Sequence, residues 1–221
     1  LCIDKAGNTF NAPAKKSVDA LPWLLHCLVV SDYWPNAAEQ AFLEKQLGKY
    51  VKTFLDSDGN LQTMRYAEMR DAVFYDRSAY SIALIARMAH CAKVLKLQGF
   101  PYDEQQYQDE LLNHYWNGHY FDADRTTKAF SAECALMPFF LNVIDNRDMA
   151  DRTFDYITKA KLNALYPMQY GEAGREHLFK YRIAMGSKLM PNYTGTSIWT
   201  WHGTFYLHIL KKYGRPEYHT Q

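Results

Sequence analysis

The feature that most constrains the fold is a series of helix-like segments joined by connections of alternating length. Apolar residues recur every three to four positions through most of the chain, which is the period of an amphipathic helix. A Ser at residue 17 opens the first segment, and Gly59 and Gly99 follow two later ones. The expected helices cover residues 17–31, 36–55, 79–97, a stretch after Pro101, 131–145, 146–162 and 196–213. We therefore predict an all-α fold made of helical hairpins.

Short connections follow the first, third and fifth of these helices, whereas long ones follow the second, fourth and sixth. In a row of antiparallel hairpins, alternate connections lie at opposite ends, so the three long ones are expected to share one end. They comprise residues 56–78, 117–131 and 164–195. Loops of this length inside a compact domain are usually functional or disordered, and the aromatic content of residues 164–195 favours order. The end that carries the long connections is the predicted functional face.

Composition narrows the class of protein further. The 221 residues show no linker or shift in composition, so residues 1–221 are expected to form a single domain. Aromatic residues make up 15% of the chain, with 17 Tyr, 12 Phe and 5 Trp, which suggests a groove or cavity lined by rings. The formal net charge of +1 makes a nucleic-acid partner improbable, because phosphate binding needs a basic surface.

The sequence gives no sign of a cofactor, a metal site or a membrane span. The four cysteines, Cys2, Cys27, Cys91 and Cys134, lack CxxC spacing and are interpreted as reduced thiols. The His residues form no HxH or HExxH motif, and no apolar run reaches the length of a membrane helix. Free thiols and the lack of a visible secretory signal favour a cytoplasmic location.

The long connections place carboxylates beside aromatic rings. The sets are Glu68, Asp71 and Asp76 with Tyr75 and Tyr80; Asp122, Asp124 and Glu133 with Trp116 and Phe121; and Glu172 and Glu176 with Tyr170 and Tyr193. Taken singly, such carboxylates are usually solvated and such rings usually belong to the core. On one face, however, the rings could stack on sugars and the carboxyls could act as acid and base. This combination favours glycoside hydrolysis as the function.

Four stretches carry a resemblance to the six-hairpin (α/α)6 glycosidases, nearest to amylo-α-1,6-glucosidase, the C-terminal domain of glycogen-debranching enzymes, and to glucoamylase-like enzymes. They are "SVDALPWLLHCL", "EMRDAVFYDRSAYSIAL", "FSAECALMPFFLNVIDNRDMA" and "MPNYTGTSIWTWHGTFYLHILKKYG". The second is similar to a W-x-D-A…R segment, with Met69 in place of Trp. The fourth resembles a Y-x-G-T-x-W-P-W segment. The resemblance covers residues 17 to 214 and implies hydrolysis of α-linked glucosides with inversion and without a cofactor.

The resemblance also implies roles for individual residues. Asp71 corresponds to the general acid, and Arg70 and Arg77 would orient it or lower its pKa. Further substrate contacts are expected from Glu133, Tyr193, Trp199 and Trp201, and the rings of Tyr80 and Trp116 are additional candidates. The catalytic base of the family lies on a later connection, so Glu172 or Glu176 is expected to serve instead, or the base is missing.

Two further expectations follow. The family's toroid has twelve helices, whereas this chain predicts about seven, so it would form a partial toroid with exposed apolar helix faces that a second copy or another chain covers. Without a base, the protein would bind a saccharide and not hydrolyse it. A helical scaffold for protein partners is a third hypothesis, although the sequence has no TPR or ankyrin period.

Overall fold

The fold described here is that of a computed structural model of the chain. The structure describes residues 2–3, 9–10, 17–63, 68, 73–74, 76–164, 168–181, 192–193 and 195–219. Within these residues there are seven α-helices: α1 (Ala20–Val30), α2 (Ala37–Phe54), α3 (Ala79–Val94), α4 (Glu104–His114), α5 (Ala132–Phe140), α6 (Arg147–Lys159) and α8 (Thr200–Lys212). Two 3-10 helices, η1 (Glu176–Leu178) and η2 (Pro216–His219), accompany them. The predicted all-α class is confirmed.

Two small antiparallel pairs of strands complete the described elements. Strand β1 (Cys2–Ile3) pairs with β2 (Thr9–Phe10), and β3 (Val73–Phe74) pairs with β4 (Lys180–Tyr181). The second pair joins the first long connection to the third, because Val73 lies opposite Tyr181 and Phe74 opposite Lys180. Each strand has only two residues, so these pairs do not form a sheet layer.

Four of the helices begin where a short polar side chain satisfies free N–H groups of the first turn. Asn36 caps α2 and forms a capping box with Glu39. Ser78 caps α3 by accepting from the backbone N–H of Ser81, and Asp103 and Asn146 act in the same way at α4 and α6. These local signals explain why these four helices start within a few residues of their predicted positions.

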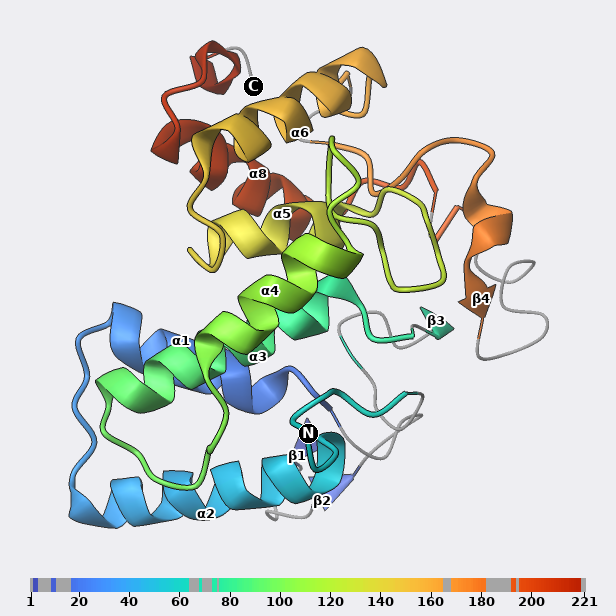
Figure 1. The fold of residues 1–221 in the computed structure, drawn as a ribbon. Helices are drawn as coiled ribbons and strands as arrows, with labels where there is room; N and C mark the ends of the chain where they lie inside the picture. The colour runs from blue at the N-terminus through green and yellow to red at the C-terminus, as the bar shows by residue number, and fades with distance from the viewer. Residues whose placement is uncertain are drawn as a thin grey trace.

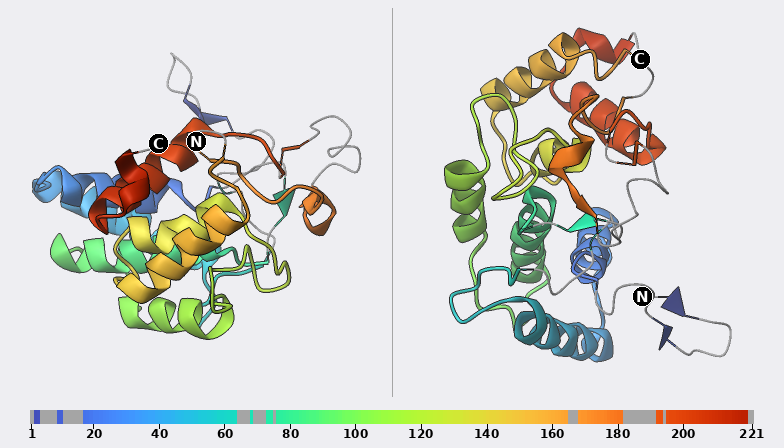
Figure 2. Two further views of the ribbon diagram at one scale, coloured as in Figure 1. Left: turned by 90° about the horizontal axis from the view of Figure 1, so that it is seen from above. Right: turned by 90° about the vertical axis from the view of Figure 1, so that its right-hand side faces the viewer.

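The helices run alternately in opposite directions, so their connections divide between two ends (Figure 1). The short connections lie together at one end, and the described parts of the three long connections lie at the other. Seen along the helices, α1, α3, α5 and α8 form an inner row, with α2, α4 and α6 on its outer side (Figure 2). All four inner helices therefore start at the end that carries the long connections.

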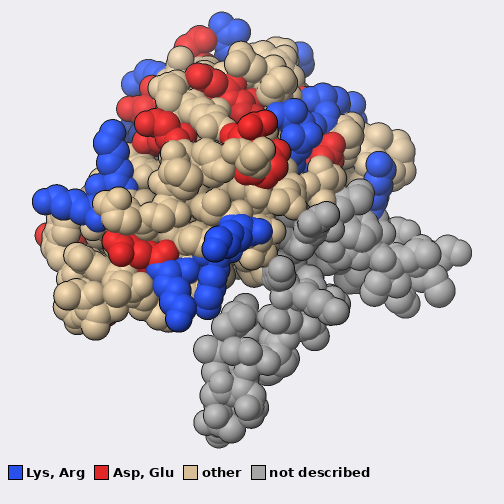
Figure 3. All heavy atoms as spheres, turned by 60° about the horizontal axis from the view of Figure 1, so that its bottom comes forward, with Lys and Arg blue, Asp and Glu red and all other residues tan. Residues whose placement is uncertain are grey.

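Helix α3 is the centre of the core, because it packs against α1, α4 and α5, while α5 packs against α8. The turn after α3 passes close to α2 and requires glycine. At Gly99, φ is +98°, and a Cβ atom would lie 3.1 Å from the carbonyl oxygen of Glu44. On the surface, Lys and Arg are interspersed with Asp and Glu over the described part of the face in Figure 3.

Candidate functional site

The described parts of the long connections pack together at the start of the inner helices. Val73, Ala123, Ala129 and Phe179, which come from all three connections, form a small apolar core of their own. Tyr193 packs against this core. The expectation that the three connections share one face is therefore confirmed, and the space around the helix N-termini is the candidate site.

A buried carboxylate lies at the start of α3. Glu68 is 6% exposed, and its Oε2 accepts hydrogen bonds from the hydroxyls of Ser81, at 2.6 Å, and Ser78. These donors and the positive end of the helix dipole compensate for the cost of burying the carboxylate. Glu68 therefore fixes the connection that precedes α3.

Tyr80 lies in the packing between α1 and α3, although the sequence suggested a substrate contact. Its side chain is fully buried, and its hydroxyl accepts from the Trp23 indole N–H at 3.0 Å and donates to Asp19 at 3.2 Å. Burial raises the pKa of the Tyr80 hydroxyl, and the nearby Asp19 carboxylate adds to this effect. Tyr80 thus joins α1 to α3 as a neutral phenol.

A second buried carboxylate lies at the start of α5. Glu133 is 1% exposed, and its Oε1 accepts from the hydroxyl of Tyr170. The Nε2 atom of His202, on α8, is 3.6 Å from the other carboxylate oxygen. The Trp201 ring stacks on His202 with a centroid distance of 4.3 Å. Two of the predicted substrate residues, Glu133 and Trp201, therefore meet around a histidine that connects α5 to α8.

Trp199 is half-buried at the start of α8 and carries an unsatisfied donor. Its indole Nε1 is shielded from solvent, and no described residue accepts a hydrogen bond from it. The ring meets that of Tyr193 edge-on, with centroids 5.2 Å apart. A buried N–H without an acceptor costs about 1–3 kcal/mol. Tyr193 and Trp199 were both predicted substrate contacts, and the structure brings their rings together.

Glu172 faces α6. Its Oε1 accepts from the Tyr156 hydroxyl at 2.6 Å and its Oε2 from Arg175 at 2.8 Å. Both oxygens are thus engaged by donors. For the other candidate base, Glu176, only the backbone belongs to the described residues, as part of η1.

The remaining predicted site residues divide into two groups. Asp71 and Arg70 lie outside the described residues, so the structure does not place the expected general acid. Arg77 has a φ of +56°, and its Nε is 3.6 Å from the Asp76 carboxylate. Trp116 packs its ring against Phe121, with centroids 5.1 Å apart. Both described residues therefore stabilise the connections in which they lie.

His202 was not predicted as a site residue, and Glu68 and Tyr170 were named only among the carboxylates and rings of the long connections, without individual roles. Glu68 was visible as one of several carboxylates, but its serine partners lie 10 and 13 residues further along the chain. Tyr170 is 37 residues from Glu133. Sequence periodicity identifies only neighbours on the same helix or strand. The partners of Glu68 and Glu133 lie on other elements, so only the folded structure shows them.

The described residues contain neither a membrane span nor a metal-binding cluster. None of their helices is long and apolar enough to cross a lipid bilayer. Within the same residues, no group of three or more His, Cys, Asp or Glu side chains could hold a metal ion.

The sequence was also compared with known proteins. No protein-family model matches the chain, and no curated protein sequence matches it.

Proposed function

We propose that the protein is a glycoside hydrolase that acts on α-linked glucosides by an inverting acid–base mechanism, similar to amylo-α-1,6-glucosidase. The chain would form part of an (α/α)6 toroid, with its site at the N-termini of the inner helices. The observation that carries the proposal is the indole N–H of Trp199, which has no acceptor among the described residues and lies beside the ring of Tyr193. A sugar offers both a hydroxyl oxygen to accept from this donor and an apolar face to lie on the rings.

In this mechanism Asp71 protonates the glycosidic oxygen, and a second carboxylate activates water on the opposite side of the sugar. The described residues on either side of Asp71 in the sequence are Glu68, which accepts from Ser78 and Ser81 at the start of α3, and Val73, which pairs with Tyr181. Arg70 and Arg77 are the proposed orienting residues, and Glu133 and Trp201 complete the sugar contacts. This chemistry needs no cofactor.

One observation favours a second candidate function, saccharide binding without hydrolysis. Glu172 is a proposed base, but both of its oxygens already accept hydrogen bonds, from Tyr156 and Arg175. A general base needs a free oxygen within reach of the attacking water. If Glu176 also fails to act as the base, the rings and Glu133 would bind a sugar that is not cleaved.

The test is glucose release from maltose, isomaltose, panose and a branched dextrin, measured for the wild type and for Asp71→Asn. We expect the substitution to reduce kcat/KM by at least about a hundredfold, since it removes the proton donor. Asp109→Asn, at an exposed position of α4, is the control and should retain full activity. Equal activity of Asp71→Asn and the wild type would refute the role of Asp71.

Trp199→Phe separates hydrolysis from binding. It keeps a ring but removes the N–H group, so we expect weaker binding of isomaltose in a tryptophan-fluorescence or calorimetric titration. Sugar binding by the wild type without glucose release would support the binding function. Neither binding nor release of any sugar in the panel would refute both.

The proposal extends to location and assembly. Cys27, Cys91 and Cys134 are free thiols, which suits the reducing cytoplasm. Helix α1 has no charged side chain, yet Leu24 is 43% exposed and Val30 61% exposed. We propose that a second copy or another chain covers this face. Sedimentation velocity over a range of concentrations tests self-association.

A further inference from the structure

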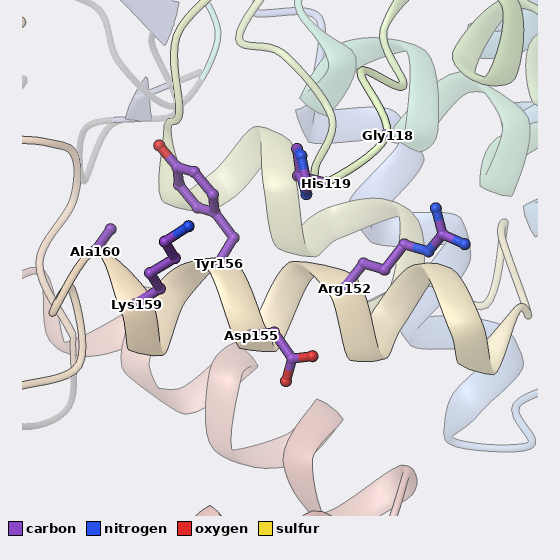
Figure 4. A pocket seen from close by; sticks show the side chains of 7 residues that line it. All are labelled: Gly118, His119, Arg152, Asp155, Tyr156, Lys159 and Ala160. Atoms are coloured by element: carbon purple, nitrogen blue, oxygen red, sulfur yellow. The ribbon is translucent and has the colours of Figure 1, made fainter.

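A cavity of about 670 Å³ opens beside α6. This helix lies on the outer side of the inner row (Figure 2). One wall is α6 itself, and the other is the start of the long connection that follows α4 (Figure 4). Its polar and aromatic side chains are those of His119, Arg152, Asp155, Tyr156 and Lys159. The volume lies in the range of small-molecule sites, about 300–1,000 Å³.

The wall formed by the connection is held in place by hydrogen bonds. The Asn117 side chain accepts from the backbone N–H groups of His119 and Tyr120, both at 3.0 Å. The hydroxyl of Thr153, on α6, donates to the carbonyl of His119 at 2.9 Å. His119 is therefore hydrogen-bonded to α6, the helix that forms the opposite wall. The cavity is thus preorganised for a ligand.

On α6, a single stripe faces the cavity. Arg152, Tyr156 and Lys159 are four and three residues apart, so their side chains follow one another on the same side of the helix. Figure 4 shows these three side chains on the side of His119, whereas Asp155, which also lines the cavity, points to another side of the helix. The stripe thus presents two cations with a phenol between them.

The carboxylates near the cavity have cationic partners of their own. Asp155 pairs at 2.9 Å with Arg215, which it shares with Asp151 and Glu217. Asp148 pairs with Arg152 at 2.9 Å. Among the described residues, no carboxylate lies within ion-pair distance of Lys159. Arg152 and its partner are both exposed, so this pair is weak and can open for a stronger acceptor. The residues that line the cavity therefore include two cations, Arg152 and Lys159, and one carboxylate, Asp155.

Tyr156 forms a fixed apolar wall between these cations. Its ring packs against Tyr120 at 4.5 Å and against Phe130 at 5.9 Å between centroids. Its hydroxyl donates to Glu172, which holds the ring from the other side. The His119 ring lies 6.3 Å from it at an angle of 32°. A flat, ring-sized group would find an aromatic surface here.

We infer that this cavity binds a small organic anion, one carboxylate or phosphate group on a ring-sized body. Arg152 and Lys159 hold the anionic group, and His119 and Tyr156 contact the ring. Arginine suits both oxyanions because its guanidinium donates two parallel hydrogen bonds to either. The inference does not depend on the proposed hydrolase function, because Arg152, Lys159 and His119 have no part in it and Glu172 serves here only as the acceptor of the Tyr156 hydroxyl.

Calorimetric titration of the full chain tests the inference with four probes. Benzoate and phenyl phosphate carry both a ring and a charge, inorganic phosphate lacks the ring, and benzyl alcohol lacks the charge. We expect benzoate, phenyl phosphate or both to bind at least about fivefold more tightly than inorganic phosphate and benzyl alcohol. Binding of only one of the two identifies the anion class. Undetectable binding of both at millimolar concentrations would overturn the inference.

Substitutions with matched controls locate the site. Lys159→Gln and Arg152→Gln should each weaken binding of the charged probe at least about fivefold. Lys52→Gln removes the equivalent lysine from the last turn of α2, and Arg147→Gln removes the other arginine of α6 that pairs with an aspartate four residues away. Both controls should bind as the wild type does. An equal loss in the controls would show non-specific attraction to surface charge and would overturn the inference.

Discussion

Helices α1 and α3 lie side by side but differ sharply in burial. Helix α1 has no charged side chain in its 11 residues, yet only Pro22, Leu25 and His26 are buried. Helix α3 contains Arg87 and Lys93, yet 13 of its 16 residues are buried. The more apolar helix is therefore the more exposed one.

The difference follows from position in the row of inner helices. Helix α3 has neighbours on three sides, α1, α4 and α5, whereas α1 lies at the end of the row. A helix that is apolar all round is normally buried on all sides. The proposal that a further chain packs on α1 rests on this contrast, and the exposed side chains of Leu24 and Val30 mark the surface that such a chain would cover. Four predictions test this contrast.

The largest expected effect comes from equal truncations in the two helices. Leu84 on α3 is 1% exposed, and Leu24 on α1 is 43% exposed. Leu84→Ala should lower the free energy of unfolding by about 3 kcal/mol, because it removes buried methyl groups and leaves a cavity. Leu24→Ala should cost less than about 1 kcal/mol. Urea denaturation measures both values, and equal losses would mean that α1 is covered in solution.

Thiol reactivity gives the next largest contrast. Cys27 on α1 is exposed, whereas Cys91 on α3 is buried. Burial raises the pKa of the Cys91 thiol to about 11, so little reactive thiolate is present at neutral pH. Iodoacetamide should modify Cys27 about a hundredfold faster, as read by peptide mass spectrometry. Protection of Cys27 that increases with protein concentration would show that a second copy covers α1.

Much of this fold could be predicted from sequence because its signals are local. Helix α2 was expected at residues 36–55 and is Ala37–Phe54, since its cap and apolar period both lie within the segment. Helix α5 was expected to reach residue 145 but ends at Phe140. The N–H groups of Val143 and Ile144 both bond to the carbonyl of Pro138, so the chain turns there although its residues remain apolar.

The start of α8 and the environments of the site residues depend on residues that are distant in the sequence. Helix α8 was expected from residue 196 but begins at Thr200, because Ile198 forms a bridge with Gln169 and Ser197 accepts from the N–H of Tyr170. Aromatic content indicated rings at this end but not their environments. From the sequence, Tyr80 and Trp199 were both predicted to contact substrate. In the structure Tyr80 is fully buried, whereas the N–H of Trp199 has no acceptor among the described residues.

The third prediction concerns a polar contact between the two helices. Arg87 on α3 donates from Nε to Nδ1 of His26 on α1 at 3.1 Å, which requires a neutral imidazole at that atom. Burial and the Arg87 charge lower the pKa of His26 from 6.5 to about 4. Between these values the unfolded chain binds a proton that the folded chain does not. The contribution of His26 to stability should therefore be complete above about pH 6.5 and fall by up to about 3 kcal/mol as the pH approaches 4.

Because other groups also titrate in acid, this loss is measured as a difference between two proteins. His26→Gln keeps an acceptor for Arg87 but does not titrate. Urea midpoints measured at several pH values from neutral down to the lowered pKa of His26 should fall less steeply for the variant than for the wild type. Parallel pH profiles would mean that His26 is protonated as easily in the folded as in the unfolded state.

The smallest expected effect is the coupling between Trp23 on α1 and Tyr80 on α3. The indole N–H donates to the Tyr80 hydroxyl, which in turn donates to Asp19 at the start of α1. A double-mutant cycle of Trp23→Phe and Tyr80→Phe should give a coupling energy of about 1 kcal/mol in urea denaturation. The cycle cancels the ring area that Trp23→Phe also removes. Strictly additive losses would show that the Trp23–Tyr80 hydrogen bond does not contribute to the attachment of α1 to α3, which would then rest on apolar packing and on the contact between Arg87 and His26.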